Sequence, residues 1–247
     1  MAGHSKWANI KRRKGAQDAK RGKQFTKVIK EIHVAVKTGG DDPDGNPRLR
    51  LAIQSAKAVN MPKDNVERAI KKASGADSAD YIETTYEGYA PHGVAVMLEC
   101  ATDNNTRTVQ NVRSVFNKYG GSLGTNGSVD YLFETKGVFT LKLPENYNEE
   151  ELMLEIIDAG AEDVEFEEDM AVVTCAKDDF GNMQKKLDGM DVEIENGELQ
   201  RIPGTTVELG DEEFKSVMKL IDAMEDDDYV QKVYHNLEIL ESQQELI

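Results

Sequence analysis

The chain has 247 residues, 39% hydrophobic and 31% charged, with a formal net charge of −16. No stretch approaches the ~18 consecutive apolar residues of a membrane span, and the N-terminus lacks the apolar core of a signal peptide, so we expect a cytoplasmic protein with no membrane partner. Residues 1–75 hold 18 Lys and Arg against 7 Asp and Glu, a net charge of +11, whereas the remainder carries −27. Such asymmetry favours a polyanion-binding segment joined to an acidic body.

The basic segment is predicted to be helical. Apolar residues recur at helical spacing through residues 24–38, and Gly39-Gly40 supplies a stop. Asn46 is then an N-cap with Pro47 in the first helical turn, and a third helix is predicted to start at residues 60–62. Three short amphipathic helices predict a small bundle.

Strand-like patterns follow a linker at residues 75–80. We expect strands over 81–89 and 93–100, a helix from Asn104 or Asn105 to Lys118, and a strand over 128–133. Beyond this region come a short strand over 206–209, a helix with Asp211 as its N-cap, and a last element around 230–240.

The stretch between these two regions has its own order of elements. It is predicted as strand 138–143, helix 149–159, strand 163–167, strand 170–175, helix 177–187 and strand 191–201. This β-α-β-β-α-β order is ferredoxin-like. We therefore expect an α+β protein of three domains, a three-helix bundle and two α/β domains, one of them ferredoxin-like and inserted in the other. The predicted boundaries are 1–78 for the basic helical domain, 79–135 with 204–247 for the discontinuous α/β domain, and 136–203 for the inserted domain.

The basic stretch is the candidate nucleic-acid site. Residues 11–14 are consecutive cations typical of an arm, while Lys20, Lys23, Lys27 and Lys30 are spaced by three, four and three and so line one side of a helix. The candidate contacts are Lys6, Lys11, Arg12, Arg13, Lys14, Lys20, Arg21, Lys23, Lys27 and Lys30. Such a surface binds phosphates through released counterions. Trp7 could stack on a base or anchor the arm to a neighbouring domain.

Other patterns favour plain structural roles. The glycine-rich residues 119–129 follow a helix and lead into a strand, which indicates a cap and turn rather than a phosphate cradle. Residues 41–46 lack the spacing of a calcium loop. The acidic residues 225–228 either keep polyanions away, face a basic partner protein, or only aid solubility.

Catalysis and cofactor binding have no support in the sequence. Cys100 and Cys175 lie in apolar strand-like runs typical of core positions, and the four histidines show no metal-ligand spacing. Nucleophile-elbow, phosphate-loop and zinc-protease motifs are all missing. We expect a non-enzyme with no cofactor, no metal and no small-molecule substrate.

The sequence closely resembles the YebC/PmpR family, which includes the mitochondrial translational activators of cytochrome oxidase subunit synthesis. The motifs that carry the resemblance are MAGHSKWANIKRRKGAQDAKRGKQFTK, GGDDPDGNPRLR, YEGYAPHGVAVMLEC, TDNNTRT, GGSLGTNGSVDYLFETKGV and VQKVYHN, in that order and over essentially the full length. The resemblance implies the same three-domain fold.

The resemblance also implies a function in gene expression. The family is usually described as probable DNA-binding transcriptional regulators, and its members are linked to translation, including relief of ribosomes stalled at proline-rich stretches. The first hypothesis is therefore a DNA-binding transcriptional regulator. The alternative is a translation factor that contacts ribosomal or transfer RNA and the ribosome. We further expect reversal of Lys20, Lys23 and Lys27 to Glu to abolish polyanion binding with little change in melting temperature.

Overall fold

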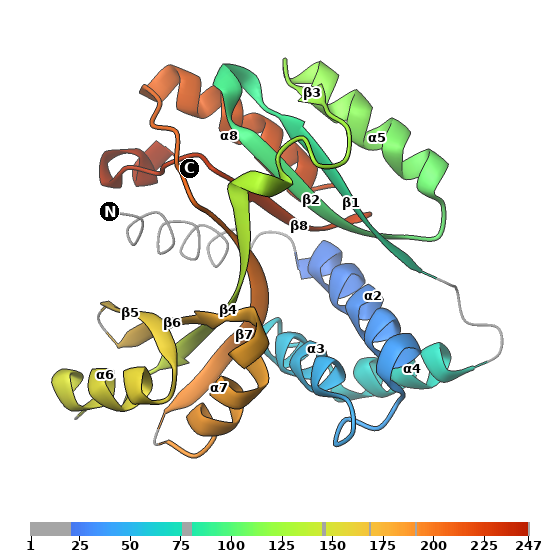
Figure 1. Ribbon diagram of the computed structural model, residues 1–247. Coiled ribbons are helices and arrows are strands. Elements are labelled where there is room, and N and C mark those ends of the chain that lie inside the picture. The colour runs from blue at the N-terminus through green and yellow to red at the C-terminus, as the bar shows by residue number, and fades with distance from the viewer. Residues whose placement is uncertain (1–20, 76–80, 145–146, 168, 191, 247) are drawn as a thin grey trace. The chain divides into compact units, whose positions relative to one another are not determined.

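The computed structural model describes residues 21–75, 81–144, 147–167, 169–190 and 192–246 (Figure 1). These residues form two compact units. The first contains the described chain up to Phe133 and again from Pro203 onward, and the second contains residues 134–202. The two units hold one four-stranded sheet each.

Three helices form the N-terminal part of the first unit. They are α2 (Arg21–Gly39), α3 (Pro47–Ala58) and α4 (Lys63–Ser74). Asn46 joins the first two helices: its side chain accepts a hydrogen bond from the Leu49 amide at 3.1 Å and donates one to the Ala35 carbonyl at 2.7 Å. The bundle core is apolar and includes Ile32, Leu49 and Ala69. The predicted cap and first residue of α3 are confirmed.

Helix α4 begins at Lys63, directly after the predicted start region 60–62, with Pro62 at the N-cap position. Asn60 does not cap this helix. It adopts a left-handed conformation with φ of 55° just after α3, and its amide donates to the Lys57 carbonyl at 2.8 Å. Asn tolerates this conformation because its short polar side chain bonds locally. Pro62 precedes α4 without a side-chain cap, so Asn60 ends one helix rather than beginning the next.

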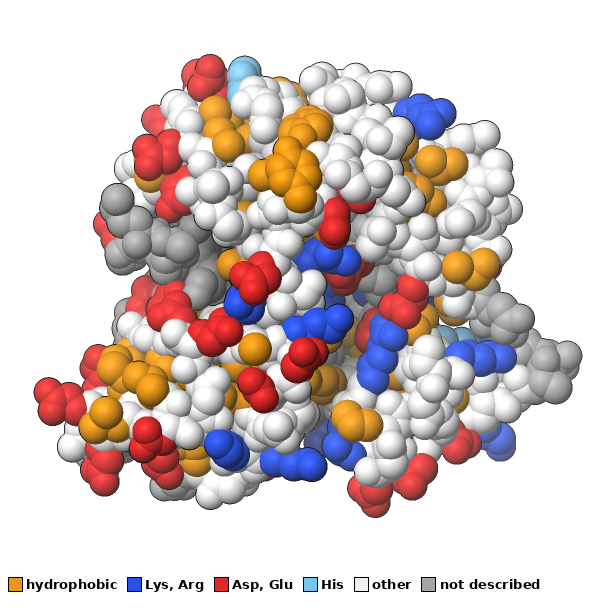
Figure 2. Space-filling model, viewed as in Figure 1, with side chains coloured by type: hydrophobic (Ala, Val, Ile, Leu, Met, Phe, Trp, Pro, Cys, Tyr) orange, Lys and Arg blue, Asp and Glu red, His pale blue; other side chains and the backbone are white. Residues whose placement is uncertain are grey.

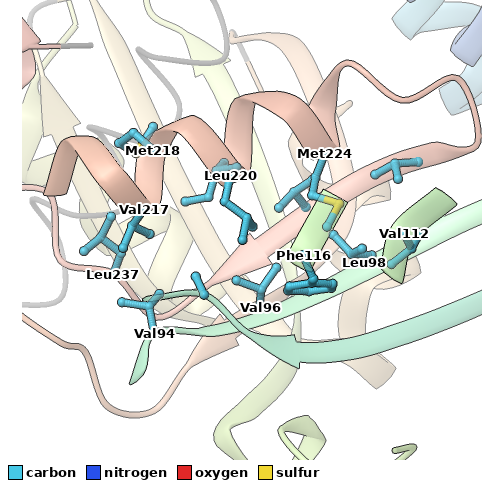
Figure 3. Packing of buried hydrophobic residues seen from close by; sticks show 14 of the residues in the cluster. Val94, Val96, Leu98, Val112, Phe116, Val217, Met218, Leu220, Met224 and Leu237 are labelled. Atoms are coloured by element: carbon cyan, nitrogen blue, oxygen red, sulfur yellow. The ribbon is translucent and has the colours of Figure 1, made fainter. Parts of the chain in front are cut away.

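The sheet of the first unit has the strand order β3-β1-β2-β8, with neighbouring strands antiparallel. The elements are β1 (Ile82–Tyr89), β2 (Ala95–Thr102), β3 (Ser122–Leu123), β8 (Val230–His235), α5 (Asn105–Lys118) and α8 (Asp211–Glu225). Alternate β2 residues such as Val96 and Leu98 pack with α5 and α8, as Figure 3 shows. Met97 belongs to a separate cluster on the opposite face with Phe133. Thus α5 and α8 cover the same side of the sheet.

The predicted strand over 128–133 is wrong. This stretch is a turn followed by a 3-10 turn (Asp130–Leu132), and the strand begins only at Phe133. The cause is the buried carboxylate of Glu87, which accepts hydrogen bonds from the amides of Gly127 at 2.7 Å, Val129 at 2.7 Å and Asp130 at 2.9 Å. These amides are therefore unavailable to a strand ladder.

Two smaller expectations near the C-terminus also need correction. The predicted strand over 206–209 is a single parallel bridge between Val207 and Leu237. Helix α8 starts at Asp211, and the residue before it is Gly210, which has no side chain to act as a cap. Asp211 instead adds a negative charge to the first turn, where the helix dipole favours it.

The second unit contains the ferredoxin-like elements. They are β4 (Phe133–Lys142), α6 (Glu149–Asp158), β5 (Ala161–Glu167), β6 (Met170–Ala176), α7 (Phe180–Leu187) and β7 (Glu193–Pro203), with a 3-10 turn (Lys177–Asp179) before α7. The first residue of β4 and the last residue of β7 belong to the first unit. The strand order is β5-β6-β4-β7, the arrangement that a split βαβ pair produces. The core includes Phe139, Leu141 and Val173. The predicted fold class, α+β with a helical bundle and a ferredoxin-like insertion, is confirmed.

Candidate nucleic-acid interface

Only part of the predicted basic site lies within the described residues. Lys6, Lys11, Arg12, Arg13, Lys14 and Lys20 lie outside them, and so does the side chain of Arg21 at the start of α2. Lys23, Lys27 and Lys30 lie on α2. These three lysines show what the described part of the ridge contacts.

The amino groups of these lysines contact the chain at the end of α8 and just after it. Lys27 Nζ donates to the main-chain oxygen of Glu225 at 2.7 Å, and Lys23 Nζ donates to that of Asp226 at 3.0 Å. Lys30 Nζ donates to the main-chain oxygen of Asp228 and, at 3.4 Å, to that of Ala101. Glu225 is the last residue of α8, so the lysines bind carbonyls at a helix C-terminus. Positive charge at that position stabilises a helix through its dipole.

Burial differs along the ridge. Lys30 is only 6% exposed, whereas the Lys23 side chain is 48% exposed. Burial lowers the pKa of both Lys27 and Lys30, and nearby carboxylates, led by Glu225 and Asp228 respectively, oppose the shift. Lys30 Nζ also lies 4.8 Å from the Tyr229 ring centroid, within cation–π range. The lysines therefore hold α2 against the end of α8.

Arg48 of α3 makes a second contact between the helices and the sheet. Its guanidinium donates to Glu83 of β1 at 2.6 and 2.9 Å and to Glu31 of α2 at 2.8 Å. The Arg48 hydrogen bonds lower the pKa of Glu83, although burial opposes the shift. This planar fork suits two carboxylates at once, so Arg48 is occupied by protein acids.

The sequence predicted the spacing of the α2 lysines but not their partner. For the acidic residues 225–228 the sequence leaves three roles open: a barrier to polyanions, a face for a basic partner protein, or solubility alone. These residues contact a basic ridge of the same chain. Figure 2 shows Lys and Arg side chains lying next to Asp and Glu on the visible face, rather than in a field of one sign.

The glycine-rich loop is not a phosphate cradle. Its amides converge on Glu87, so a carboxylate of the protein itself takes the place that an anion would need. The turn predicted from the sequence is confirmed by Gly120 and Gly127, which have φ of 76° and 82°. Glycine adopts this left-handed region without steric cost.

The cysteines and histidines within the described residues do not assemble a reactive site. Burial raises the pKa of Cys100 to about 12 and of Cys175 to about 11, so neither thiol is activated as a nucleophile. His33 is buried on α2, and its ring makes a T-shaped contact with the Tyr81 ring. No group of three or more His, Cys, Asp or Glu in the described ranges is arranged to hold a metal ion. No described helix is both long and apolar enough to cross a membrane.

Comparison with known proteins places this architecture in one family. The profile described as "TACO1/YebC protein N-terminal domain" matches residues 5–76, and the profile described as "TACO1/YebC second and third domain" matches residues 81–237. A crystal structure of a conserved hypothetical protein from Aquifex aeolicus has the same fold, with a TM-score of 0.82 and 44% identity over 91% of this chain and 93% of that one.

Curated relatives agree over nearly the full length. A probable transcriptional regulatory protein from Amoebophilus asiaticus is 55% identical over 96% of this chain and 98% of its own. The probable transcriptional regulatory protein YrbC of Bacillus subtilis is 51% identical over 96% and 99%. The chain belongs to the TACO1/YebC family.

Proposed function

We propose that this protein is a cytoplasmic, DNA-binding transcriptional regulator whose basic helical domain, residues 1–78, contacts the phosphate backbone. The observation that carries the proposal is the charge asymmetry: +11 in residues 1–75 against −27 in the rest of the chain. A net charge of −16 would repel DNA, so binding needs a locally positive surface.

The names of the relatives support a regulatory role. Proteins that share about half of their residues with this chain over almost all of its length are named probable transcriptional regulatory proteins. Two buried thiols with raised pKa values and no metal-ligand cluster among the described residues favour binding over catalysis.

The contacts of α2 divide the ten candidate cations. Lys23, Lys27 and Lys30 donate to main-chain oxygens at the end of α8 and just after it, so their amino groups are already engaged within the chain. DNA binding is therefore assigned to the cations before them: Lys6, Lys11, Arg12, Arg13, Lys14, Lys20 and Arg21. Because consecutive cations present no pattern that reads base edges, we assign them to phosphates.

The test is the salt dependence of binding to a fluorescently labelled duplex DNA, measured by anisotropy between about 50 and 200 mM salt. The variant K11Q/R12Q/R13Q/K14Q removes four cations of the arm. The matched control K142Q/K177Q/K185Q/K186Q removes four exposed cations of the ferredoxin-like unit. If all four arm residues contact phosphates, the slope of log K against log salt shrinks by up to about 3.6, and the control keeps the parent slope.

Two outcomes contradict this proposal. Equal slopes for the parent and the arm variant would remove the arm from the binding surface. Binding to single-stranded or structured RNA with no measurable duplex DNA binding would replace DNA by RNA as the partner, which is the behaviour of a translation factor.

A further inference from the structure

A second region of the chain has the charge character of a polyanion-binding surface. Residues 104–129 contain three cations and no Asp or Glu, although residues 130–247 contain 33. This segment comprises α5, the edge strand β3 and the glycine-rich loop as far as Val129. It carries a charge of +3 within a body of −27.

The outer face of α5 is polar and exposed. Val112 and Phe116 point into the core with no exposed surface. The opposite side presents exposed amides, hydroxyl groups and cations: Gln110, Asn111, Arg113, Ser114, Asn117 and Lys118. Arg107 at the start of the helix is paired with Asp103 at 2.7 Å. Within the described part of the chain, Arg113 and Lys118 have no ion pair with an acid.

This composition is not a general property of the layer. Helix α8 packs beside α5 on the same side of the sheet, and both contribute to one core, with Phe116 from α5 and Leu220 from α8 (Figure 3). Yet α8 carries five acids, at positions 211, 212, 213, 222 and 225, against two lysines. The two neighbouring helices therefore have net charges of opposite sign. The acidic α8 repels a phosphate backbone, and the basic α5 attracts it.

The loop that follows α5 is braced by hydrogen bonds to residues of β1. The Glu87 carboxylate fixes the amides of Gly127 and Val129, and the Glu87 main-chain oxygen accepts from Gly124 at 2.8 Å. Tyr89 Oη donates to the Ser128 carbonyl at 3.1 Å. Residues 124–127 are nevertheless exposed. A rigid exposed loop loses little conformational entropy when it binds a partner.

We propose that the outer face of α5 together with residues 120–127 is a second contact surface for the sugar–phosphate backbone of nucleic acid. Cations and amide and hydroxyl side chains are groups that contact phosphates and sugars. The inference rests on the proposed function, because it adds a second surface to a protein already bound through its basic arm. It predicts that one nucleic acid molecule contacts both surfaces.

The test compares two double variants of the full chain. R113Q/K118Q removes the two unpaired cations of α5, and K215Q/K219Q removes the same charge from α8. Gln preserves helix propensity in both. Binding of a labelled duplex DNA is measured against salt, as for the arm variant. We expect the slope to shrink by about 1.8 for R113Q/K118Q, one phosphate for each cation, and to stay at the parent value for K215Q/K219Q.

The readouts separate this proposal from the proposed function. If the slope of log K against log salt shrinks for the arm variant but not for R113Q/K118Q, the arm binds nucleic acid and the α5 surface does not. If the parent chain binds no nucleic acid, both proposals are wrong. A melting temperature equal to the parent's ensures that R113Q/K118Q is folded. Crosslinks between DNA and the parent protein provide a second readout: nucleotide-modified peptides within residues 104–129 support the second surface, and crosslinks confined to residues 1–75 contradict it.

Discussion

Helices α2 and α5 both carry several cations, but these cations lie in different surroundings. On α2, Lys27 and Lys30 donate to main-chain oxygens at the end of α8 and are withdrawn from solvent. On α5, Arg113 and Lys118 are exposed and make no ion pair within the described residues. The more numerous cations of α2 thus make a structural contact, whereas the fewer cations of α5 remain exposed to solvent. The number of cations on a helix does not by itself identify a binding face.

A substitution at Lys30 should have the largest effect, because this lysine is the most buried of the described α2 cations that contact the end of α8. Lys30→Glu places an acid in a buried position beside the main-chain oxygen of Asp228 and should lower the free energy of unfolding by about 3–5 kcal/mol. Lys23→Glu, at a half-exposed position on the same ridge, should lower it by about 1 kcal/mol or less. Urea denaturation of the two variants measures both values. Equal small losses would mean that the ridge is a solvated face.

The structure therefore changes what a triple reversal of Lys20, Lys23 and Lys27 should do. The sequence-based expectation is a lost binding surface and an almost unchanged melting temperature. Because Lys27 holds the last carbonyl of α8, we now expect the triple variant to melt at a lower temperature as well. Binding lost in that variant would not identify a binding site.

The second test concerns the support of the α5 surface. Glu87→Ala leaves three amides without their acceptor and should lower the free energy of unfolding by about 2–4 kcal/mol. Hydrogen exchange at Gly127 and Val129 should accelerate more than exchange in α5. Glu134→Ala, at an exposed position, is the matched control and should change stability by about 0.5 kcal/mol or less. Unchanged exchange in the loop would show that Glu87 does not hold it.

The third test asks whether Arg48, like the α2 lysines, is engaged by groups of the same chain. Arg48→Gln loses the bonds to Glu31 and Glu83 and should cost about 1 kcal/mol, because the partners are partly exposed. DNA affinity should stay at the parent value. If the Arg48→Gln variant is as stable as the parent but binds DNA more weakly, Arg48 contacts DNA rather than the protein's own carboxylates.

Local signals predicted the elements that local residues control. Asn46, the predicted cap of α3, caps that helix in the structure, and Asn104, one of the two predicted starts of α5, is the N-cap of α5. The strand over 128–133 was misassigned because its amides are bound by a carboxylate about forty residues earlier in the chain. The partner of Lys27 is 198 residues away. Contacts of this length leave no periodic pattern in either segment.

The smallest expected effect is a pH dependence from His33, which faces Tyr81 on the buried side of α2. Burial lowers the pKa of His33, and Lys72 and Lys37 act in the same direction. Below about pH 6.5 the unfolded chain binds the proton more strongly than the folded one, so stability falls as the pH drops from 6.5 toward the folded pKa. His33→Phe removes that proton and should flatten the dependence. The free energy of unfolding is measured by urea denaturation at several pH values. If its pH dependence is the same in the variant as in the parent, groups other than His33 cause that dependence.

The measurement that tests the account most directly is ultraviolet crosslinking of the full-length protein in growing cells, followed by sequencing of the attached DNA and RNA. The account predicts discrete DNA sites for the parent chain, strongly reduced recovery for K11Q/R12Q/R13Q/K14Q, and parent recovery for K142Q/K177Q/K185Q/K186Q. Recovery of ribosomal or transfer RNA without DNA sites, or equal recovery from the arm variant, would contradict it.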